Sequence, residues 1–232
     1  MRYDITNIPV GEVFEEQDGG CPICRLRNKL ESRAVEYITG AAMMEPDIRI
    51  ETNQQGFCID HYRMMLAQRN RLGVALILES HLQEMQQRVF EGGLPLLGKN
   101  AKKQARDADK VGHSCFVCRQ VDSAMEKMLA TVCRTWEAQA DFRRLFEEQP
   151  CLCLPHFAAL TQTAESTISK KEQPYFAQAA SRLAKQYIEE LRGDIRHFCD
   201  MYDYRNVGAD ADWGNSKDAV ERAIAYLTTR RP

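Results

Sequence analysis

The sequence predicts a mainly α protein built from a duplicated helical unit. Three observations lead to this prediction. Apolar residues recur at about the helical period of 3.6, few segments alternate with period two, and a set of cysteine motifs occurs twice in the same order. The 232 residues are 44% hydrophobic and 28% charged, as in ordinary globular proteins. A chain of this length buries roughly 70% of its surface on folding, so it can form a core without disulfides.

The duplication is visible in three motifs that recur in the second half of the chain. Between the two cysteine motifs lie 33 residues in the first copy and 34 in the second. Because the order is the same and the spacing nearly equal, we interpret the chain as two copies of one unit. The matching motifs are Cys21–Arg25 with Cys115–Arg119, Asp47–Arg49 with Asp141–Arg143, and Cys58–Tyr62 with Cys153–Phe157.

Helices are expected throughout the first copy. An apolar stripe continues from Ile23 to Ile38, and Leu72–Phe90 is typical of a longer helix. Gly92, Gly93, Pro95 and Gly98 then break the pattern, and the polar, mostly basic Lys99–Lys110 is interpreted as a connection. We therefore expect a first metal-binding repeat over residues 1–98, a linker over 99–112, and a second metal-binding repeat with a helical extension over 113–232. The stripe consists of Ile23, Leu26, Leu30, Val35 and Ile38.

The second copy is expected to end in long helices. Pro174–Tyr204 keeps a helical pattern over its whole length. A last helix is predicted over about Lys217–Thr229, with Asn215 or Ser216 as its N-cap, because both side chains can accept a hydrogen bond from the first turn.

The cysteine motifs predict two metal sites, one in each half. Structural zinc binds four cysteine or histidine ligands in a tetrahedron, and two cysteines separated by two residues can both face one ion. Buried cysteines would be the ordinary alternative, but they would not explain a histidine in the same position of both copies. Each ion would join the start of one helix to the start of another. The first site would consist of Cys21, Cys24, Cys58 and His61, and the second of Cys115, Cys118, Cys153 and His156.

Zinc is the expected ion at both sites, with an iron–sulfur cluster as the alternative, since thiolate-rich sites suit both. Three thiolates and a neutral imidazole around a divalent cation leave one negative charge. Arg25 and Arg119 can offset it through N–H to sulfur hydrogen bonds, or can lie exposed on helix faces. Asp47 and Asp141 can orient the histidines, but are better explained as helix caps.

The remaining cysteines and histidines fall outside the repeated motifs. Cys133 and Cys199 occur in helical patterns and are expected in the core. Cys151 places a third thiol beside Cys153, where it could exchange onto the metal or be oxidised, although a packed cysteine is the simpler explanation. His113 is either an alternative ligand or an exposed loop residue. No signal of ligation distinguishes His81 and His197.

Charge and composition exclude several classes of protein. A net charge of −2 lacks the basic character that phosphate-backbone binding requires, so nucleic acid is an unlikely partner. The longest apolar run, Leu72–Leu78, is too short to cross a bilayer, and residues 1–20 contain no apolar signal segment. We therefore expect a cytoplasmic protein with reduced cysteines. The sequence contains no motif for hydrolysis, phosphate binding or dinucleotide binding. This absence is weak evidence that the protein is not an enzyme.

Several motifs resemble those of a bacterial protein family of unknown function. The resemblance covers most of the chain and supports the metal-binding pattern, while implying no particular activity. Its motifs are Cys21-Pro-Ile-Cys-Arg-Leu26, Asn53-x-x-Gly-Phe-Cys-x-x-His61, Cys153-Leu-Pro-His-Phe157 and Phe198-Cys-Asp-Met-Tyr-Asp-Tyr-Arg205.

Two functions follow from the sequence as hypotheses. The first is a zinc-binding interaction or regulatory module that acts on a protein partner, because two closed metal sites and long helices are typical of such modules. The alternative is an iron–sulfur or thiol-redox protein, an oxidoreductase, motivated by the thiol-rich sites and by Cys151.

Overall fold

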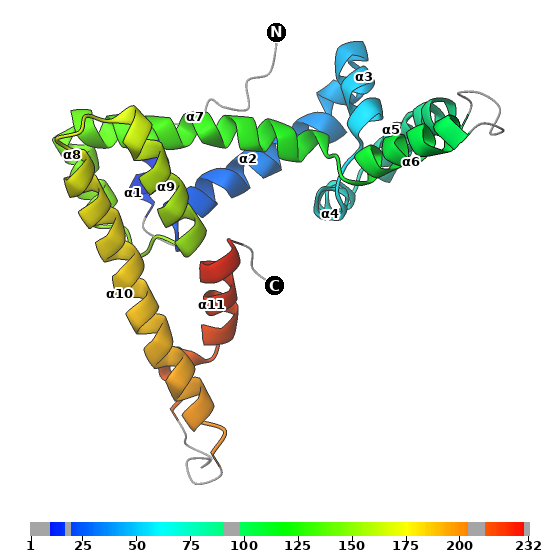
Figure 1. Cartoon of the computed structure of the whole chain (residues 1–232). Coiled ribbons are helices and arrows are strands. Elements are labelled where there is room, and N and C mark those ends of the chain that lie inside the picture. The colour runs from blue at the N-terminus through cyan, green and yellow to red at the C-terminus, as the bar shows by residue number, and fades with distance from the viewer. Residues whose placement is uncertain (1–9, 17–19, 91–97, 204–211, 230–232) are drawn as a thin grey trace. The chain divides into compact units, whose positions relative to one another are not determined.

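The structure is a computed structural model that describes residues 10–16, 20–90, 98–203 and 212–229, with only the backbone of 98–100. Within these residues the chain is helical and forms no β-strand, which confirms the predicted mainly α class (Figure 1). The expected breaks at Gly92, Gly93 and Pro95 lie outside the described residues, as do Tyr204 and Arg205. None of the described helices combines the length and apolar character that crossing a membrane requires.

Contacts divide the chain into two compact units. Within the described residues, unit 1 contains Asn28–Met125, and unit 2 contains the described parts of Ile8–Arg27 and Glu126–Pro232. Two helices, α2 (Pro22–Thr39) and α7 (Phe116–Ala138), contribute residues to both units. Each unit therefore contains parts of both predicted repeats, whereas the repeat boundaries themselves remain a prediction.

Unit 1 is organised around the pairing of α3 with α5. The predicted helix over Leu72–Phe90 is present, although its last five residues form a wider π-helical turn that contacts α6. The segment expected as a linker is itself helical, as α6, and Gly98, expected as a break, is the first residue of this helix. The elements that begin in unit 1 are η1 (Ala41–Met44), α3 (Pro46–Gln55), α4 (Ile59–Ala67), α5 (Arg71–Met85), η2 (Gln86–Phe90) and α6 (Gly98–Gly112).

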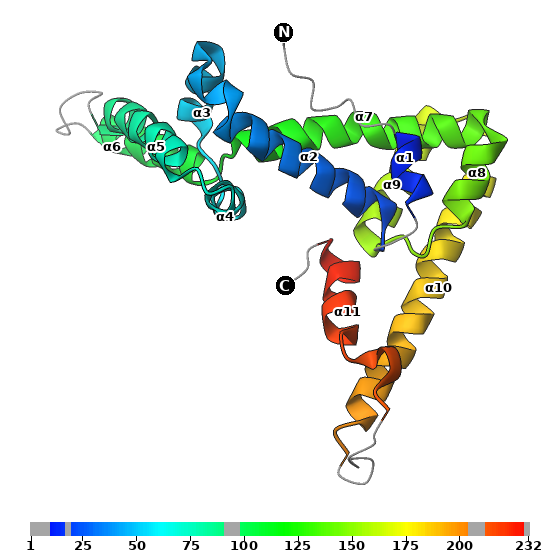
Figure 2. The same ribbon diagram turned by 180° about the vertical axis from the view of Figure 1, so that it is seen from behind.

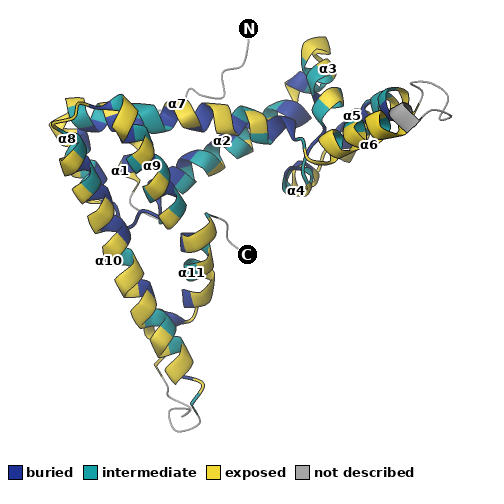
Figure 3. Ribbon diagram, in the orientation of Figure 1, coloured by how far each residue is buried: buried dark blue, intermediate teal, exposed yellow. Residues whose placement is uncertain are grey.

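Unit 2 is built on the long helix α10, which packs against α9, α8 and α11. Figure 2 shows these helices from behind, with the short α1 beside α8. Buried residues concentrate in the first half of α10, and its second half is largely exposed (Figure 3). The elements wholly in unit 2 are α1 (Val10–Glu15), α8 (Ala140–Glu147), α9 (Leu154–Thr167), α10 (Gln173–Asp200), η3 (Gly214–Ser216) and α11 (Ala219–Thr228).

Apolar side chains form the core that the helical pattern predicts. All five residues of the predicted α2 stripe are between 0% and 2% exposed. In unit 2 the Phe14 ring lies 4.9 Å from Phe142 and 5.9 Å from Phe146, measured between ring centroids. Phe176 contacts both Phe146 and Trp136, at 5.4 Å and 5.1 Å. These rings hold α1, α7, α8 and α10 together at one end of the unit.

The helices that follow the two Cys-x-x-Cys motifs occur in the same order. A long helix that begins at the first cysteine motif, α2 or α7, precedes a short helix, α3 or α8. A helix that begins at the second motif follows, α4 or α9, and then α5 or α10. Asp47 and Asp141 lie in the first turns of α3 and α8, but the N-caps are Glu45 and Gln139, so the predicted capping role is wrong. As first-turn carboxylates they can still interact favourably with the helix dipole.

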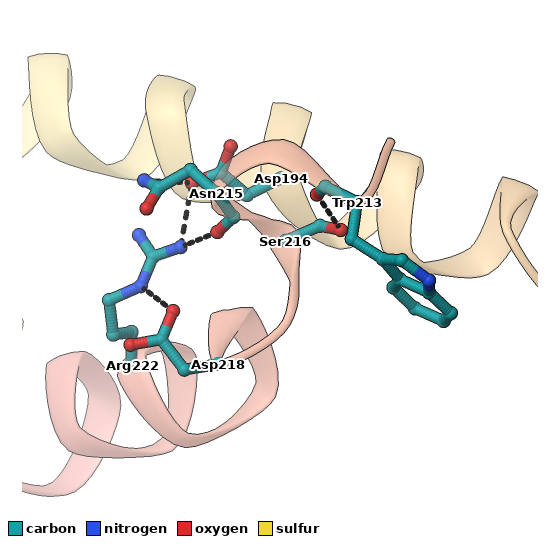
Figure 4. A network of polar contacts seen from close by, with 6 residues as sticks. All are labelled: Asp194, Trp213, Asn215, Ser216, Asp218 and Arg222. Atoms are coloured by element: carbon teal, nitrogen blue, oxygen red, sulfur yellow. Dashed lines mark hydrogen bonds and ion pairs between the residues drawn. The ribbon is translucent and has the colours of Figure 1, made fainter. Parts of the chain in front are cut away.

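The last helix, α11, is confirmed, but its cap is not the predicted one. Asp218 is the N-cap, because Asn215 and Ser216 are taken up by the 3-10 turn η3 before it. Arg222 links α11 to α10 by donating to Asp194 at 2.9 Å. It also donates to the N-cap Asp218 at 2.8 Å and to the carbonyl of Asn215 in η3 (Figure 4).

Candidate metal centres

The structure brings all eight predicted ligands into two clusters. The first contains Cys21, Cys24, Cys153 and His156 and is called the α2/α9 cluster, after the helices that begin there. The second contains Cys58, His61, Cys115 and Cys118 and is called the α4/α7 cluster. In each cluster the four candidate ligand atoms lie within 4.8 Å of one another, a geometry able to hold one metal ion.

The composition of the clusters corrects the predicted sites. The Cys-x-x-Cys motif of the first copy meets the Cys-x-x-His motif of the second copy, and the reverse holds for the other cluster. Sites formed within one copy, with Cys24 beside His61 or Cys118 beside His156, are therefore wrong. The expectation that each cluster joins the starts of two helices is confirmed. Each cluster lies within one compact unit.

In the α2/α9 cluster, one histidine nitrogen faces three sulfurs. The Nδ1 atom of His156 lies 3.1 Å from the sulfur of Cys153, 3.3 Å from that of Cys24 and 3.7 Å from that of Cys21. The sulfurs of Cys24 and Cys153 are 3.7 Å apart. Cys21, Cys153 and His156 are buried and Cys24 is half-buried, so little of the cluster faces solvent.

The α4/α7 cluster repeats this arrangement. The Nδ1 atom of His61 lies 3.1 Å from the sulfur of Cys58, 3.3 Å from that of Cys115 and 3.5 Å from that of Cys118. The sulfurs of Cys58 and Cys118 are 3.8 Å apart. The same nitrogen and nearly the same separations are found in both clusters, although different helices supply the side chains.

Local backbone structure explains how the cysteines reach these positions. Cys58 and Cys153 are the N-caps of α4 and α9, with extended φ and ψ of −73° and 166° and of −68° and 155°. Neither sulfur makes the usual side-chain capping hydrogen bond, so both can face their clusters. The histidine three positions later lies in the first helical turn, on the same side. Pro22 and Pro155 favour the first turns of α2 and α9.

Helix starts supply favourable electrostatics at both clusters. The N-termini of α2 and α9 meet at one cluster, and those of α4 and α7 meet at the other. A helix N-terminus carries roughly half a positive charge, and it lowers the free energy of a nearby thiolate. Two such termini can offset much of the single negative charge that three thiolates and one imidazole leave around a divalent cation.

Sulfur contacts and burial shift the thiol pKa values in the α2/α9 cluster. Hydrogen bonds with Cys153 and Cys21, together with burial, raise the pKa of the Cys24 thiol far above its ordinary value. Burial opposes ionisation of Cys21 as well, but hydrogen bonds from Cys153, Cys24 and His156 outweigh it and lower the pKa of that thiol. Of the three thiols, only that of Cys21 therefore has its pKa lowered, whereas the pKa values of Cys24 and Cys153 are raised. A bound cation would favour all three thiolates, because it compensates both burial and repulsion.

In the α4/α7 cluster, burial is the largest cause of the shifts. It raises the pKa of the Cys115 thiol, although hydrogen bonds from Cys118 and Cys58 oppose the rise. Burial also raises the pKa of Cys118, and contacts with Cys115 and Cys58 raise it further. Both clusters therefore disfavour three free thiolates and are suited to a positive ion.

The two arginines that follow the Cys-x-x-Cys motifs do not donate to sulfur in the described contacts, contrary to the predicted charge-compensating role. Arg25 donates to the Gln149 side chain at 2.8 Å and to the carbonyls of Val13, Glu16 and Gly20. Arg119 donates to the side chain of Gln55 at 2.7 Å and pairs with Glu51. Each arginine thus bonds the glutamine that shortly precedes the Cys-x-x-His motif of its own cluster. This hydrogen bond links the segments that carry the two motifs of each cluster.

Sequence reasoning assigned no structural role to Gly56 or His81, which shape the loop before Cys58. Gly56 has a positive φ of 62°, and its carbonyl accepts a hydrogen bond from the Phe116 amide at 2.9 Å. The ring of His81 lies directly over it, and Nδ1 of His81 contacts the carbonyl of Asn53 at 2.7 Å. A glycine two residues before the cysteine was the available signal, because such a conformation favours glycine.

The remaining cysteines and histidines lie outside both clusters. Cys133 is buried as predicted, but Cys199 is exposed near the end of α10, so the prediction of a core position for it is wrong. Cys151 is 3% exposed, and burial raises the pKa of its thiol. His113 is exposed and contacts the carbonyl of Asp109 at 2.8 Å.

Comparisons with known proteins agree with the resemblance found in the motifs. The chain matches a protein family described as "Family of unknown function (DUF6062)" over residues 1–232. No curated protein and no solved structure shows significant similarity to the chain. Because the family match extends over the whole length and includes both clusters, the chain belongs to the DUF6062 family.

Proposed function

We propose that this protein is a zinc-stabilised helical module that binds one Zn²⁺ in each cluster and acts on a protein partner. The separations between ligand atoms carry the proposal. A tetrahedral zinc ion with bonds of about 2.3 Å to sulfur and about 2.0 Å to nitrogen sets S–S edges of roughly 3.8 Å and S–N edges of roughly 3.5 Å. The clusters have S–S separations of 3.7 Å and 3.8 Å.

The compactness of the clusters supports a single ion rather than an iron–sulfur cluster. In a cluster, two or more irons and bridging sulfides lie between the cysteine ligands, so the ligands are spread more widely. Here all four ligand atoms lie within 4.8 Å of one another. Three thiolates with one imidazole are also a common ligand set of structural zinc.

A structural role fits the ligand number better than a catalytic one. Catalytic zinc keeps a position open for water or substrate, whereas each cluster here supplies four protein ligands. The thiol-redox alternative drew on the thiol-rich sites and on Cys151. Of these, Cys151 is 3% exposed and therefore poorly accessible to an oxidant. A non-catalytic module would act through its surface, and a cytoplasmic location would keep the thiols reduced.

Elemental analysis combined with thermal unfolding tests the proposal. We expect about two zinc ions per chain, because each closed site binds one ion. A strong chelator should lower the melting temperature by at least about 10 °C, since structural zinc contributes several kcal/mol to folding. Cys24→Ser and Cys118→Ser should each lose about one ion, because each removes one ligand of a different site.

Cys199→Ser is the matched control, because Cys199 is exposed and lies outside both clusters. It should keep both ions and the melting temperature of the unchanged protein. Protein that contains iron and sulfide instead of zinc, or that melts unchanged after complete metal removal, would contradict the proposal.

A further inference from the structure

Each metal site is shared between the two copies of the repeated unit. The first copy supplies Cys21 and Cys24 to one cluster and Cys58 and His61 to the other, and the second copy completes both. Neither copy contains a complete set of four neighbouring ligands. The first copy, residues 1–98, and the second, residues 113–232, are joined along the chain only through residues 99–112, so the two copies have a single covalent connection.

Specific contacts bring the two copies together at the α4/α7 cluster. The Phe116 amide donates to the carbonyl of Gly56 at 2.9 Å, and the Ser114 hydroxyl donates to the carbonyl of Gln55 at 2.6 Å. Arg119 bonds the Gln55 side chain at 2.7 Å. These bonds join the loop before Cys58 to the start of α7 and do not involve the connection between the copies.

Equivalent contacts join the copies at the α2/α9 cluster. Gln149 accepts a hydrogen bond from Arg25 at 2.8 Å and donates to the carbonyl of Phe14 at 2.6 Å. The ring of Phe14 lies against that of Phe142, with 4.9 Å between centroids. The arginine-to-glutamine bond therefore occurs at both clusters, each time between one copy and the other.

We propose that a second copy of this chain can replace either half of the pairing, so that two chains form an exchanged dimer. This inference rests on zinc binding as proposed above. In such a dimer the first half of one chain would meet the second half of the other, and every cluster would keep its four ligands. The contacts above would all be kept, because only the connection between halves changes its course. Within one chain the halves face each other at an effective concentration of order millimolar, so exchange is favoured by high protein concentration during metal loading.

Mixed refolding of two full-length variants tests the exchange. The first variant, Cys21→Ser/Cys24→Ser, lacks the first-copy ligands of the α2/α9 cluster, and the second, Cys153→Ser/His156→Ala, lacks the second-copy ligands. Each variant alone can complete only its α4/α7 cluster and should bind about one zinc ion per chain. The variants carry different affinity tags, are unfolded in denaturant with chelator, and are refolded together at high concentration with Zn²⁺.

In an exchanged heterodimer, Cys21 and Cys24 of the second variant meet Cys153 and His156 of the first variant. Together they form one complete α2/α9 cluster. We expect the doubly purified species to be a dimer with about three zinc ions per pair of chains. A control mixture of Cys21→Ser/Cys24→Ser with a differently tagged copy of itself should give about two per pair, because no chain supplies the missing motif.

Two results would overturn the inference. One is a mixture that stays monomeric with about one ion per chain, while the unchanged protein binds about two. The other result concerns the case in which each variant alone fails to fold. In that case, a mixture that also gives no folded, zinc-loaded dimer would contradict the inference. By contrast, an unchanged protein that binds no zinc would remove the proposed function itself, so the two failures are distinguishable.

Discussion

At the scale of single residues, the sulfur atoms that lie beside each cysteine determine which cluster a substitution of that cysteine affects. Cys24 lies beside Cys153 at 3.7 Å, and Cys58 lies beside Cys118 at 3.8 Å. These neighbours come from different copies of the repeated unit. Substitutions that remove one ligand therefore report which motifs share an ion.

The proposed binding of one ion in each cluster predicts a specific pattern of thiol reactivity. Cys153→Ser should release the ion of the α2/α9 cluster, so Cys24, which is half-buried, should react with iodoacetamide at least about tenfold faster. Cys118 should stay protected, because its cluster is intact. Mass spectrometry of the alkylated peptides measures both rates. If Cys118 were exposed to reagent and Cys24 protected, the ligands would be grouped within each copy instead.

Gly56 is a second residue whose environment predicts a measurable effect. With φ at 62° and ψ at −157°, its backbone is in a region essentially restricted to glycine, and an added Cβ would lie 2.7 Å from Nε2 of His81. We expect Gly56→Ala to lower the free energy of unfolding by about 1–3 kcal/mol and to weaken zinc binding at the α4/α7 cluster.

Gly193→Ala provides the control, since a Cβ there meets nothing within 4 Å and the residue lies inside α10. Alanine at this position should raise the free energy of unfolding by about 0.5–1 kcal/mol. Urea unfolding of both zinc-loaded variants gives the comparison, and equal effects would argue against strain at Gly56.

At the scale of elements, helix ends organise most of what is distinctive in this protein. Four helix N-termini meet at the two clusters, and polar bonds rather than apolar packing alone fix the last helix. Arg222 is 18% exposed and its partner Asp194 is 24% exposed, so their pairing is only partly screened by solvent. Burial disfavours the Arg222 cation, but hydrogen bonds to Asp218, Asp194 and Tyr187 outweigh it and raise the pKa of the guanidinium.

This pairing predicts that Arg222→Ala loosens α11 from α10. Several charge-assisted hydrogen bonds are lost, so the free energy of unfolding should fall by about 1.5–3 kcal/mol. The residues of α11 should also become susceptible to limited proteolysis, while zinc content stays unchanged because no ligand is involved.

Arg144→Ala is the matched control for Arg222→Ala. The pair it breaks, with Asp141, has side chains 69% and 90% exposed. Such exposed pairs contribute about 0–1 kcal/mol. Equal sensitivity of the two variants to protease would show that the Arg222 network does not hold α11.

At the scale of the whole molecule, the two clusters lie in different compact units. Each unit surrounds one cluster with its own core, so we expect the two sites to be independent to first order. Loss of one ion should then be felt mainly by the helices around that cluster.

Amide hydrogen exchange tests this independence. Cys118→Ser should reduce protection in α4 and in the start of α7, and Cys24→Ser should reduce it in α9 and in the start of α2. In Cys118→Ser, the amide exchange rates in α10 should change less than about tenfold. The reason is that α10 packs against α9 in unit 2, whereas Cys118 lies in unit 1. Equal loss of protection in both units would indicate one cooperative structure instead.

Much of the fold was predictable because local patterns determine it. The apolar stripe of α2, the long helix α10 and the last helix α11 follow from periodicity, which reflects the side of a helix that faces the core. The predictions were wrong where alternative local structures have similar free energies. The N-cap moved from Asn215 or Ser216 to Asp218, and Cys199 is exposed, because neither a cap nor the burial of one residue is fixed by spacing alone.

The sequence alone determined the eight candidate ligands, their residue types and the helical class, because ligand chemistry and helical periodicity are properties of short segments. Only the tertiary structure decided which motifs share a cluster. In the second copy, α7 carries the chain about 35 Å over its 23 residues, and α8 spans only about 12 Å with its eight. The long helix α7 thus carries the chain away from its Cys-x-x-Cys motif, and the short helix α8 is not long enough to bring the chain back to it. Each Cys-x-x-Cys motif therefore forms its cluster with the Cys-x-x-His motif of the other copy, because the helices that carry these two motifs start side by side.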